Sequence, residues 1–308
     1  MKIGNLETKS NYFLPAVAGY SDVAMRVLCY RYGAGLCFTE MVSAKGLCYG
    51  SDNTRALLVT DDREDIKAVQ LFGREPEFIE RAIKHEALKE FDIIDFNFGC
   101  PVPKIVGNGE GSAMMKEPDL VRKIIETAVN ASEGRPITAK IRAGFNKDNV
   151  NAVEVACAIE EGGASMVTVH GRTRDMFYTG KADLEIIKKV KDNVRIPVVG
   201  NGDVVDKASA NRMFEVTGCD GIAIARGALG RPYIFAELRD ESSAIQVLDL
   251  LKEQAVMLAK VMPERIAVNN MKKHIAFYMK GIRNGKDVKL KAFQAKTLDD
   301  ILSLSLGD

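Results

Sequence analysis

The sequence predicts an α/β fold, a (β/α)8 barrel followed by a small C-terminal α-helical domain. Over the first 240 residues, short runs typical of β-strands alternate eight times with helical patterns. Eight such units in about 230 residues match the TIM barrel. After about residue 242 the strand signals stop. An open doubly wound sheet is the alternative, but the G-x-G-x-x-G fingerprint expected after its first strand is missing.

Eight runs are predicted to be strands because each is short and rich in β-branched residues. Each is also apolar on both faces, as a parallel strand covered by helices must be. The runs are residues 12–18, 36–41, 66–72, 91–97, 136–142, 166–171, 195–201 and 219–226. Parallel pairing of these runs would place all their carboxyl ends at one end of the barrel.

Helices are predicted between these strands because start signals precede the helical patterns. Ser21 and Asp22 precede the pattern from residue 23, and Asp206 precedes another. Pro76 and Pro118 open two more, at a position where a missing N–H costs nothing.

The region after residue 242 is predicted to contain two amphipathic helices. Their apolar stripes are Ala244, Val247, Leu248, Leu251, Ala255, Leu258 and Ala259 in the first, and Met271, Ile275, Tyr278 and Ile282 in the second. We therefore expect a barrel domain over residues 1–241 and a helical domain over residues 242–308.

Charge is nearly balanced over the whole chain but not over its C-terminal region. The 43 Lys and Arg residues against 42 Asp and Glu give a net charge of +1. Between residues 265 and 296, however, a single acid, Asp287, accompanies nine basic residues, which are Arg265, Lys272, Lys273, Lys280, Arg283, Lys286, Lys289, Lys291 and Lys296. A solvated helix face is one explanation. The near absence of acids favours a surface that binds a polyanion.

Length and composition are those of a globular protein. The chain has 308 residues, of which 46% are hydrophobic and 28% charged, which excludes a disordered or fibrous chain. No signal peptide and no apolar run of membrane-spanning length is present, so we expect a cytoplasmic protein that does not contact a membrane. We also expect it to be a monomer. The six cysteines form no C-x-x-C pair, which predicts free thiols. Three widely separated histidines make a metal site unexpected.

Polar residues close seven of the eight predicted strands. In this type of barrel the active site is built at the carboxyl ends of the strands. The seven residues are Glu40, Gln70, Asn97, Lys140, His170, Asn201 and Arg226. Any one of them could be a structural polar group, but seven at one rim favour a functional site.

The ends of the last two strands are typical of a phosphate site. Asn201, Gly202 and Asp203 follow the seventh strand, and Ala225 and Arg226 end the eighth. Glycines there allow backbone N–H groups to approach an anion, and the arginine adds a positive charge. Tight turns that merely need glycine are the alternative.

Lys140 and His170 are placed where a bound flavin mononucleotide, FMN, would satisfy them both. Lys140 in the barrel mouth would be a costly unpaired charge unless it faced a negative group. Both side chains could hydrogen-bond the flavin ring and stabilise its reduced anion. A core histidine bonded to a backbone carbonyl is the alternative for His170.

Cys100 stands in the longest connection between strands, the glycine-rich stretch 97–115 after the fourth strand. Long loops on the catalytic face are often functional. Gly99 and Pro101 flank the cysteine and constrain its backbone. A thiol with an ordinary pKa near 8.5 is mostly protonated at neutral pH, so it can donate a proton to a developing carbanion or enolate.

Eight motifs, in this order, resemble the tRNA-dihydrouridine synthases, and more closely their bacterial B-type branch. They are AGYSD, TEMVSAKG, VQLFG, NFGCPVPK, KIRAG, VHGRTR, GNGD and ARGALGRPYIF. The resemblance covers residues 10–240 densely and continues weakly through MKKHIAFY at residues 271–278. It implies an oxidoreductase that contains FMN, is reduced by NADPH and saturates the bond between carbons 5 and 6 of uridines in tRNA.

The resemblance also implies roles for particular residues. Cys100 corresponds to the proton donor to carbon 5, while reduced FMN delivers hydride to carbon 6. The implied FMN contacts are Ala16, Val17, Ala18, Gln70, Lys140, His170, Asn201, Gly202, Asp203, Ala225 and Arg226. The residues implied to line the uridine and tRNA-facing side are Asn97, Lys104, Arg142 and Arg172. The chain departs from the family at residues 16–18, where Pro-Met-Ala is usual, and at residue 225, where glycine is usual.

The basic helical region is expected to hold the tRNA. A uridine in folded tRNA must be extruded to reach a flavin, at a cost of a few kcal/mol that phosphate contacts can offset. One alternative is a flavin barrel acting on a free pyrimidine, similar to dihydroorotate or dihydropyrimidine dehydrogenases, which would leave the basic region unexplained. A non-catalytic tRNA-binding protein is the other.

Overall fold

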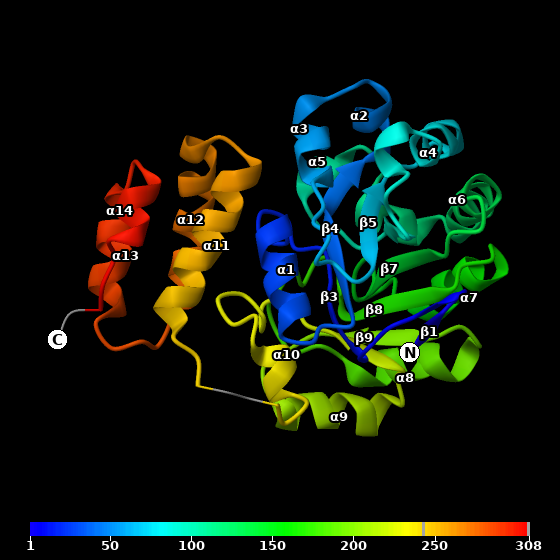
Figure 1. Cartoon of the computed structure of the whole chain (residues 1–308). Helices are drawn as coiled ribbons and strands as arrows, with labels where there is room; N and C mark the ends of the chain where they lie inside the picture. Colours follow the sequence, from blue (N-terminus) through cyan, green and yellow to red (C-terminus); the bar gives the residue numbers. More distant parts are fainter. Residues whose placement is uncertain (242–243, 307–308) are drawn as a thin grey trace.

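The computed structural model describes residues 1–241 and 244–306, which form a barrel and a helical bundle beside it (Figure 1). Eight parallel strands close the barrel, each paired with its neighbours in sequence, and the last pairs with the first. The strands are β3 (Tyr12–Leu14), β4 (Leu36–Ser43), β5 (Lys67–Phe72), β6 (Ile93–Asn97), β7 (Ile137–Gly144), β8 (Met166–Thr173), β9 (Val198–Asn201) and β10 (Gly221–Ala223). The predicted TIM barrel with C-terminal helices is confirmed.

Helices connect the strands, and the longer ones pack against the outside of the barrel. They are α1 (Val23–Arg31), α2 (Ala44–Cys48), α3 (Asp52–Arg55), α4 (Pro76–Ile83), α5 (Pro103–Gly107), α6 (Pro118–Ala131), α7 (Ala152–Glu161), α8 (Leu184–Asn193), α9 (Lys207–Thr217) and α10 (Ile234–Glu237). The start signals read from the sequence are confirmed. Asp22 and Asp206 each accept a backbone N–H of the first turn, and Pro76 and Pro118 stand at the first helical position.

Several strands end at different residues from those predicted. β3 ends at Leu14, so residues 15–18 leave the sheet. Pro15 has no N–H to donate to a ladder, which favours this early end. β7 and β8 continue two residues further than predicted, with an irregular register between Arg142 and Gly144. These differences fall at the carboxyl ends of the strands, the end of such a barrel at which an active site is expected.

A short hairpin that the sequence analysis did not predict lies at the other end of the barrel. It pairs β1 (Lys2–Ile3) with β2 (Leu6–Glu7). Its Ile3 is fully buried in one cluster with Phe13, Leu36 and Met166, which lie at the beginnings of strands. The hairpin therefore closes the amino end of the barrel, and only the carboxyl end is left to accept a ligand.

The C-terminal bundle packs against the barrel through α1 (Figure 1). Its helices are α11 (Val247–Val261), α12 (Glu264–Tyr278), α13 (Gly285–Gln294) and α14 (Leu298–Leu302). Val27 and Leu28 of α1 belong to the same hydrophobic cluster as Leu251 and Leu258 of α11. The predicted boundary residues 242 and 243 lie outside the described residues, and the division of the chain into two domains stays a prediction.

Buried polar contacts also join the two parts. His274 on α12 is fully buried, and its Nε2 lies 2.8 Å from Oδ2 of Asp22, the residue that caps α1. On the same side, the Tyr278 hydroxyl donates to Gln254 at 2.8 Å, and Gln254 contacts His274. These bonds orient the end of α12 relative to the barrel mouth, because a buried polar network is stable only with its partners in place.

Gly230 allows the closest approach between barrel and bundle. Its φ is +66°, and a Cβ there would lie 2.3 Å from the backbone nitrogen of Tyr278. Gly230→Ala is expected to lower the free energy of unfolding by about 1–3 kcal/mol, because the two backbones would have to separate. Denaturant unfolding measures the change. Gly218→Ala is the control, since Gly218 has φ +63° but open space around it; equal losses would show that the close approach is not the cause.

No helix within the described residues is both long and apolar enough to cross a membrane.

Candidate active site

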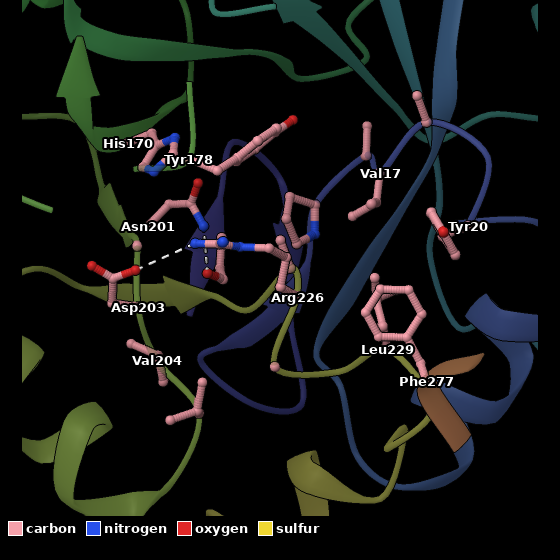
Figure 2. Close-up of a pocket in the computed structure, with 18 of the residues that line it drawn as sticks. Val17, Tyr20, His170, Tyr178, Asn201, Asp203, Val204, Arg226, Leu229 and Phe277 are labelled. Atoms are coloured by element: carbon pink, nitrogen blue, oxygen red, sulfur yellow. Dashed lines mark hydrogen bonds and ion pairs between the residues drawn. The ribbon is translucent and has the colours of Figure 1, made fainter. Parts of the chain in front are cut away.

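A cavity of about 930 Å³ lies at the carboxyl ends of the strands, between the barrel mouth and the C-terminal bundle (Figure 2). Its volume is in the usual range for a small-molecule or cofactor site. The predicted site residues that line it are Ala16, Val17, Ala18, Asn97, Cys100, Lys140, Arg142, His170, Asn201, Gly202, Asp203, Ala225 and Arg226. The barrel thus brings together residues that are up to 210 positions apart in the sequence, from 16 to 226.

Three predicted residues do not line the cavity. Gln70 and Arg172 are buried behind its wall, where they contact lining residues. Lys104 is exposed on α5. The roles predicted for these three as direct contacts of a cofactor or a nucleotide remain predictions.

The segment that carries Cys100 is fixed through its backbone. Oδ1 of Asn97 accepts the backbone N–H groups of Gly99, at 3.1 Å, and Cys100, at 2.7 Å. The carbonyl of Gly99 accepts from Nε of Arg142 at 2.8 Å, and the carbonyl of Cys100 accepts from the N–H of Ser112 at 3.0 Å. Cys100 is 8% exposed and lines the cavity. The thiol is therefore presented to a ligand on a rigid support.

The surroundings keep this thiol protonated. Burial raises the pKa of Cys100, and the N–H of Val102 and the charges of Arg142 and Lys140 oppose the shift without cancelling it. A reactive nucleophilic cysteine needs the opposite shift, toward the thiolate. The geometry and the pKa together suit a proton donor.

Lys140 brings a positive charge to the cavity. Burial lowers its pKa to about 8, helped by the charge of Arg142 and opposed by Asp95. Within residues 1–241 and 244–306, its ammonium has no hydrogen-bond or ion-pair partner. A half-buried cation without a partner is costly, so the position suits an anionic or electron-rich ligand.

His170 is a neutral imidazole here. Burial lowers its pKa far below the usual value, and the charges of Lys140 and Arg142 add to the shift. Its Nε2 lies 3.3 Å from Nη1 of Arg172, which can only donate. Nε2 is therefore the acceptor, and the ring proton stays on Nδ1, ready to be donated.

Asp203 and Arg226 mark the predicted phosphate side. Asp203 accepts from Nη2 of Arg172 at 2.7 Å and from the N–H of Ala182 at 2.8 Å, whereas Nη2 of Arg226 lies 3.4 Å away (Figure 2). Gly202 has φ +136°, and a Cβ there would lie 2.4 Å from that of Ala182. Arg226 is half-exposed and loosely held, so its guanidinium is available to an anion.

The sequence analysis missed the wall contributed by the bundle. Phe277, Tyr278, Lys280 and Ile282 line the cavity from the end of α12 and beyond. No sequence signal could place them there, because their position depends on how the bundle docks. Tyr178, by contrast, carried a signal, an aromatic residue in a polar loop after a barrel strand; it lies over the guanidinium groups of Arg142 and Arg226.

The sequence profile of the family described as "Dihydrouridine synthase (Dus)" matches residues 14–305. The chain belongs to the dihydrouridine synthase family. The "Probable tRNA-dihydrouridine synthase" of Rickettsia conorii is 37% identical over 300 residues, covering 94% of this chain and 90% of the relative. The "tRNA-dihydrouridine synthase B" of Shewanella oneidensis is 35% identical over 288 residues, covering 91% and 89%. The resemblance to the bacterial B-type branch is thus confirmed, and with it an oxidoreductase that depends on a flavin.

Solved structures similar to this dihydrouridine synthase confirm the barrel. An old yellow enzyme homologue from Zymomonas mobilis superposes with a TM-score of 0.59 at 13% identity, covering 80% of this chain and 92% of that one. Histamine dehydrogenase from Rhizobium sp. 4-9 gives 0.58 at 15% identity, covering 83% and 50%. At such identities the likeness concerns the fold alone.

Proposed function

We propose that this dihydrouridine synthase reduces the bond between carbons 5 and 6 of uridines in tRNA, with FMN as cofactor and NADPH as reductant. The observation that carries the proposal is that Cys100, whose pKa burial raises, lines the same cavity as the Lys140 cation, in a chain of this family. The two relatives above carry the names "Probable tRNA-dihydrouridine synthase" and "tRNA-dihydrouridine synthase B", and tRNA as substrate fits a cytoplasmic enzyme.

The residues around the cavity fit FMN. Lys140 and neutral His170 can hydrogen-bond the polar edge of a flavin ring, and the positive charge of Lys140 favours its anionic reduced form. Gly202 and Arg226 can hold a phosphate, and the apolar stretch 16–18 can pack on the ring. When bound and reduced, the cofactor supplies the hydride that adds to carbon 6.

The protein supplies the proton. Cys100 donates the proton of its thiol to carbon 5 of uridine, so that hydride and proton together complete the reduction of the double bond. Asn97 and Arg142 hold the cysteine backbone in place during this step. The resulting thiolate is stabilised by the nearby charges of Lys140 and Arg142.

The C-terminal bundle offers a cationic face to tRNA. All nine basic residues between 265 and 296 are at least partly exposed. None of them forms an ion pair with an acid within the described part of the chain. Exposed cations on the barrel are often paired, as Lys84 is with Glu80 and Lys188 with Asp192. Unpaired cations in one region are suited to phosphate groups.

The colour of the purified protein and the product that it forms from tRNA test the proposal directly. The purified protein is expected to be yellow, to bleach when NADPH is added, and to form dihydrouridine in tRNA, as measured by mass mapping. Reduction of free pyrimidines instead of tRNA would favour the small-molecule alternative. A colourless protein that binds tRNA would favour a docking role.

Removing two lysines from the cationic face is expected to weaken tRNA binding. Lys286→Ala with Lys291→Ala should lower the slope of log Kd against log salt by roughly 1 for each tRNA phosphate that is no longer bound, with FMN binding unchanged. Filter binding at several salt concentrations measures the slope. The control is Lys84→Ala with Lys188→Ala, which removes paired barrel cations; an equal change in both double variants would contradict a dedicated surface.

A further inference from the structure

A series of hydrogen bonds inside the barrel connects Asp95 to the backbone of Cys100. Asp95, on β6, is 2% exposed. Its Oδ2 accepts from Nε2 of Gln70 at 2.6 Å, and Oε1 of Gln70 accepts from Nδ2 of Asn97 at 2.6 Å. Oδ1 of Asn97 then accepts the N–H of Cys100 at 2.7 Å. The two amides thus link a buried carboxylate to the backbone of the proposed proton donor.

The direction of this chain is decided at Asp95. Burial raises the pKa of Asp95 to about 6, so the carboxylate is ionised at neutral pH and above and only accepts. Gln70 must then turn its NH₂ toward Asp95 and its oxygen toward Asn97. Asn97 must then donate to Gln70, which leaves its oxygen for the N–H groups of Cys100 and Gly99. Were either amide to flip, two donors or two acceptors would face each other in a buried site, at the cost of a lost hydrogen bond.

We propose that Asp95 is a positioning residue that sets the orientation of Gln70 and Asn97 and, through them, holds Cys100 in place. The other oxygen of Asp95 accepts from the Thr138 hydroxyl at 2.6 Å, so both ends of the carboxylate are fixed. Gln70, which does not line the cavity, is an inner link of this chain. The inference rests on the proposed function only for the role of Cys100, not for the coupling itself.

Variants that reverse the order of donors and acceptors between Asp95 and Asn97 provide the test. In Asn97→Asp, two carboxylates face Gln70, which can donate to only one of them. In Asp95→Asn with Asn97→Asp, Gln70 can flip, accept from the new amide and donate to the new carboxylate, whose second oxygen still accepts from Cys100. Asp95→Asn alone should disturb little, because its oxygen can accept from Gln70 while the Thr138 hydroxyl accepts from its NH₂.

The readout is the rate at which iodoacetamide alkylates Cys100 in the FMN-loaded protein without tRNA, followed by mass mapping of that peptide. Asn97→Asp is expected to speed alkylation about tenfold, because one lost hydrogen bond loosens the segment. Asp95→Asn alone should stay within about threefold of the parent, and the double variant should return to the same range. Dihydrouridine formation is measured in parallel, since Asn97 also lines the cavity.

A second single variant and its double variant keep the test usable if Asn97→Asp does not fold. Gln70→Glu places a carboxylate beside Asp95 and should also loosen Cys100, whereas Gln70→Glu with Asp95→Asn restores a donor between them. Rescue of the alkylation rate in either pair supports the proposal. A double variant as fast as its Asn97→Asp or Gln70→Glu parent would overturn it. If Cys100→Ala retained activity, the proposal that Cys100 is the proton donor would fail. The alkylation rates of the variants at residues 70, 95 and 97 would still test the link between Asp95 and Cys100.

Discussion

Cys100→Ala is expected to lower the turnover of dihydrouridine formation by roughly 10²–10⁴-fold, the usual contribution of a positioned general acid. Alanine keeps the backbone bonds to Asn97 and Ser112, so the segment is expected to keep its shape. FMN content and tRNA affinity should therefore remain close to those of the parent. Single-turnover reduction of tRNA by the reduced enzyme measures the loss.

Two observations check that the loss belongs to the thiol. Cys157→Ala, which changes a half-buried cysteine outside the cavity, should leave turnover unchanged. In the parent, turnover should fall as pH rises through the pKa of Cys100, which burial places above its ordinary value, because the thiolate has no proton to give. Cys100→Ala should lack that alkaline fall. Full activity in Cys100→Ala would show that another group is the acid.

Glu64→Ala is expected to lower the free energy of unfolding by about 3–5 kcal/mol, because it leaves a buried cation without its partner. The side chains of Arg26 and Glu64 are 2% and 1% exposed. Two hydrogen bonds join them, at 2.6 and 3.1 Å, and the backbone N–H of Asp61 also donates to Glu64. Denaturant unfolding measures the loss.

An exposed ion pair that also involves helix α1 provides the comparison. Arg31 and Glu253 link α1 to α11 with side chains about 40% exposed. Glu253→Ala should change the free energy of unfolding by about 1 kcal/mol or less, because water solvates both charges when they are apart. Similar losses in Glu253→Ala and Glu64→Ala would contradict the role given to burial.

The barrel was predictable because its signals are local. Eight apolar runs and the start signals at Asp22, Pro76, Pro118 and Asp206 each depend on a few adjacent residues, and the structure contains the corresponding strands and helices. The N-terminal hairpin was missed because two strands of two residues each, β1 and β2, are too short to show a period. The early end of β3 was missed because an apolar stretch that lines a cavity has the same composition as a buried strand.

The sequence by itself determined the order of the strands and the place of Cys100, Lys140, His170 and Arg226 at the carboxyl ends, since parallel strands in a closed barrel leave only one rim for them. Tertiary structure alone decided which of the predicted side chains line the cavity. Gln70 lies buried behind the cavity wall and the end of α12 lines the cavity, because hydrogen bonds and domain docking join residues far apart in the chain, and no local pattern records such contacts.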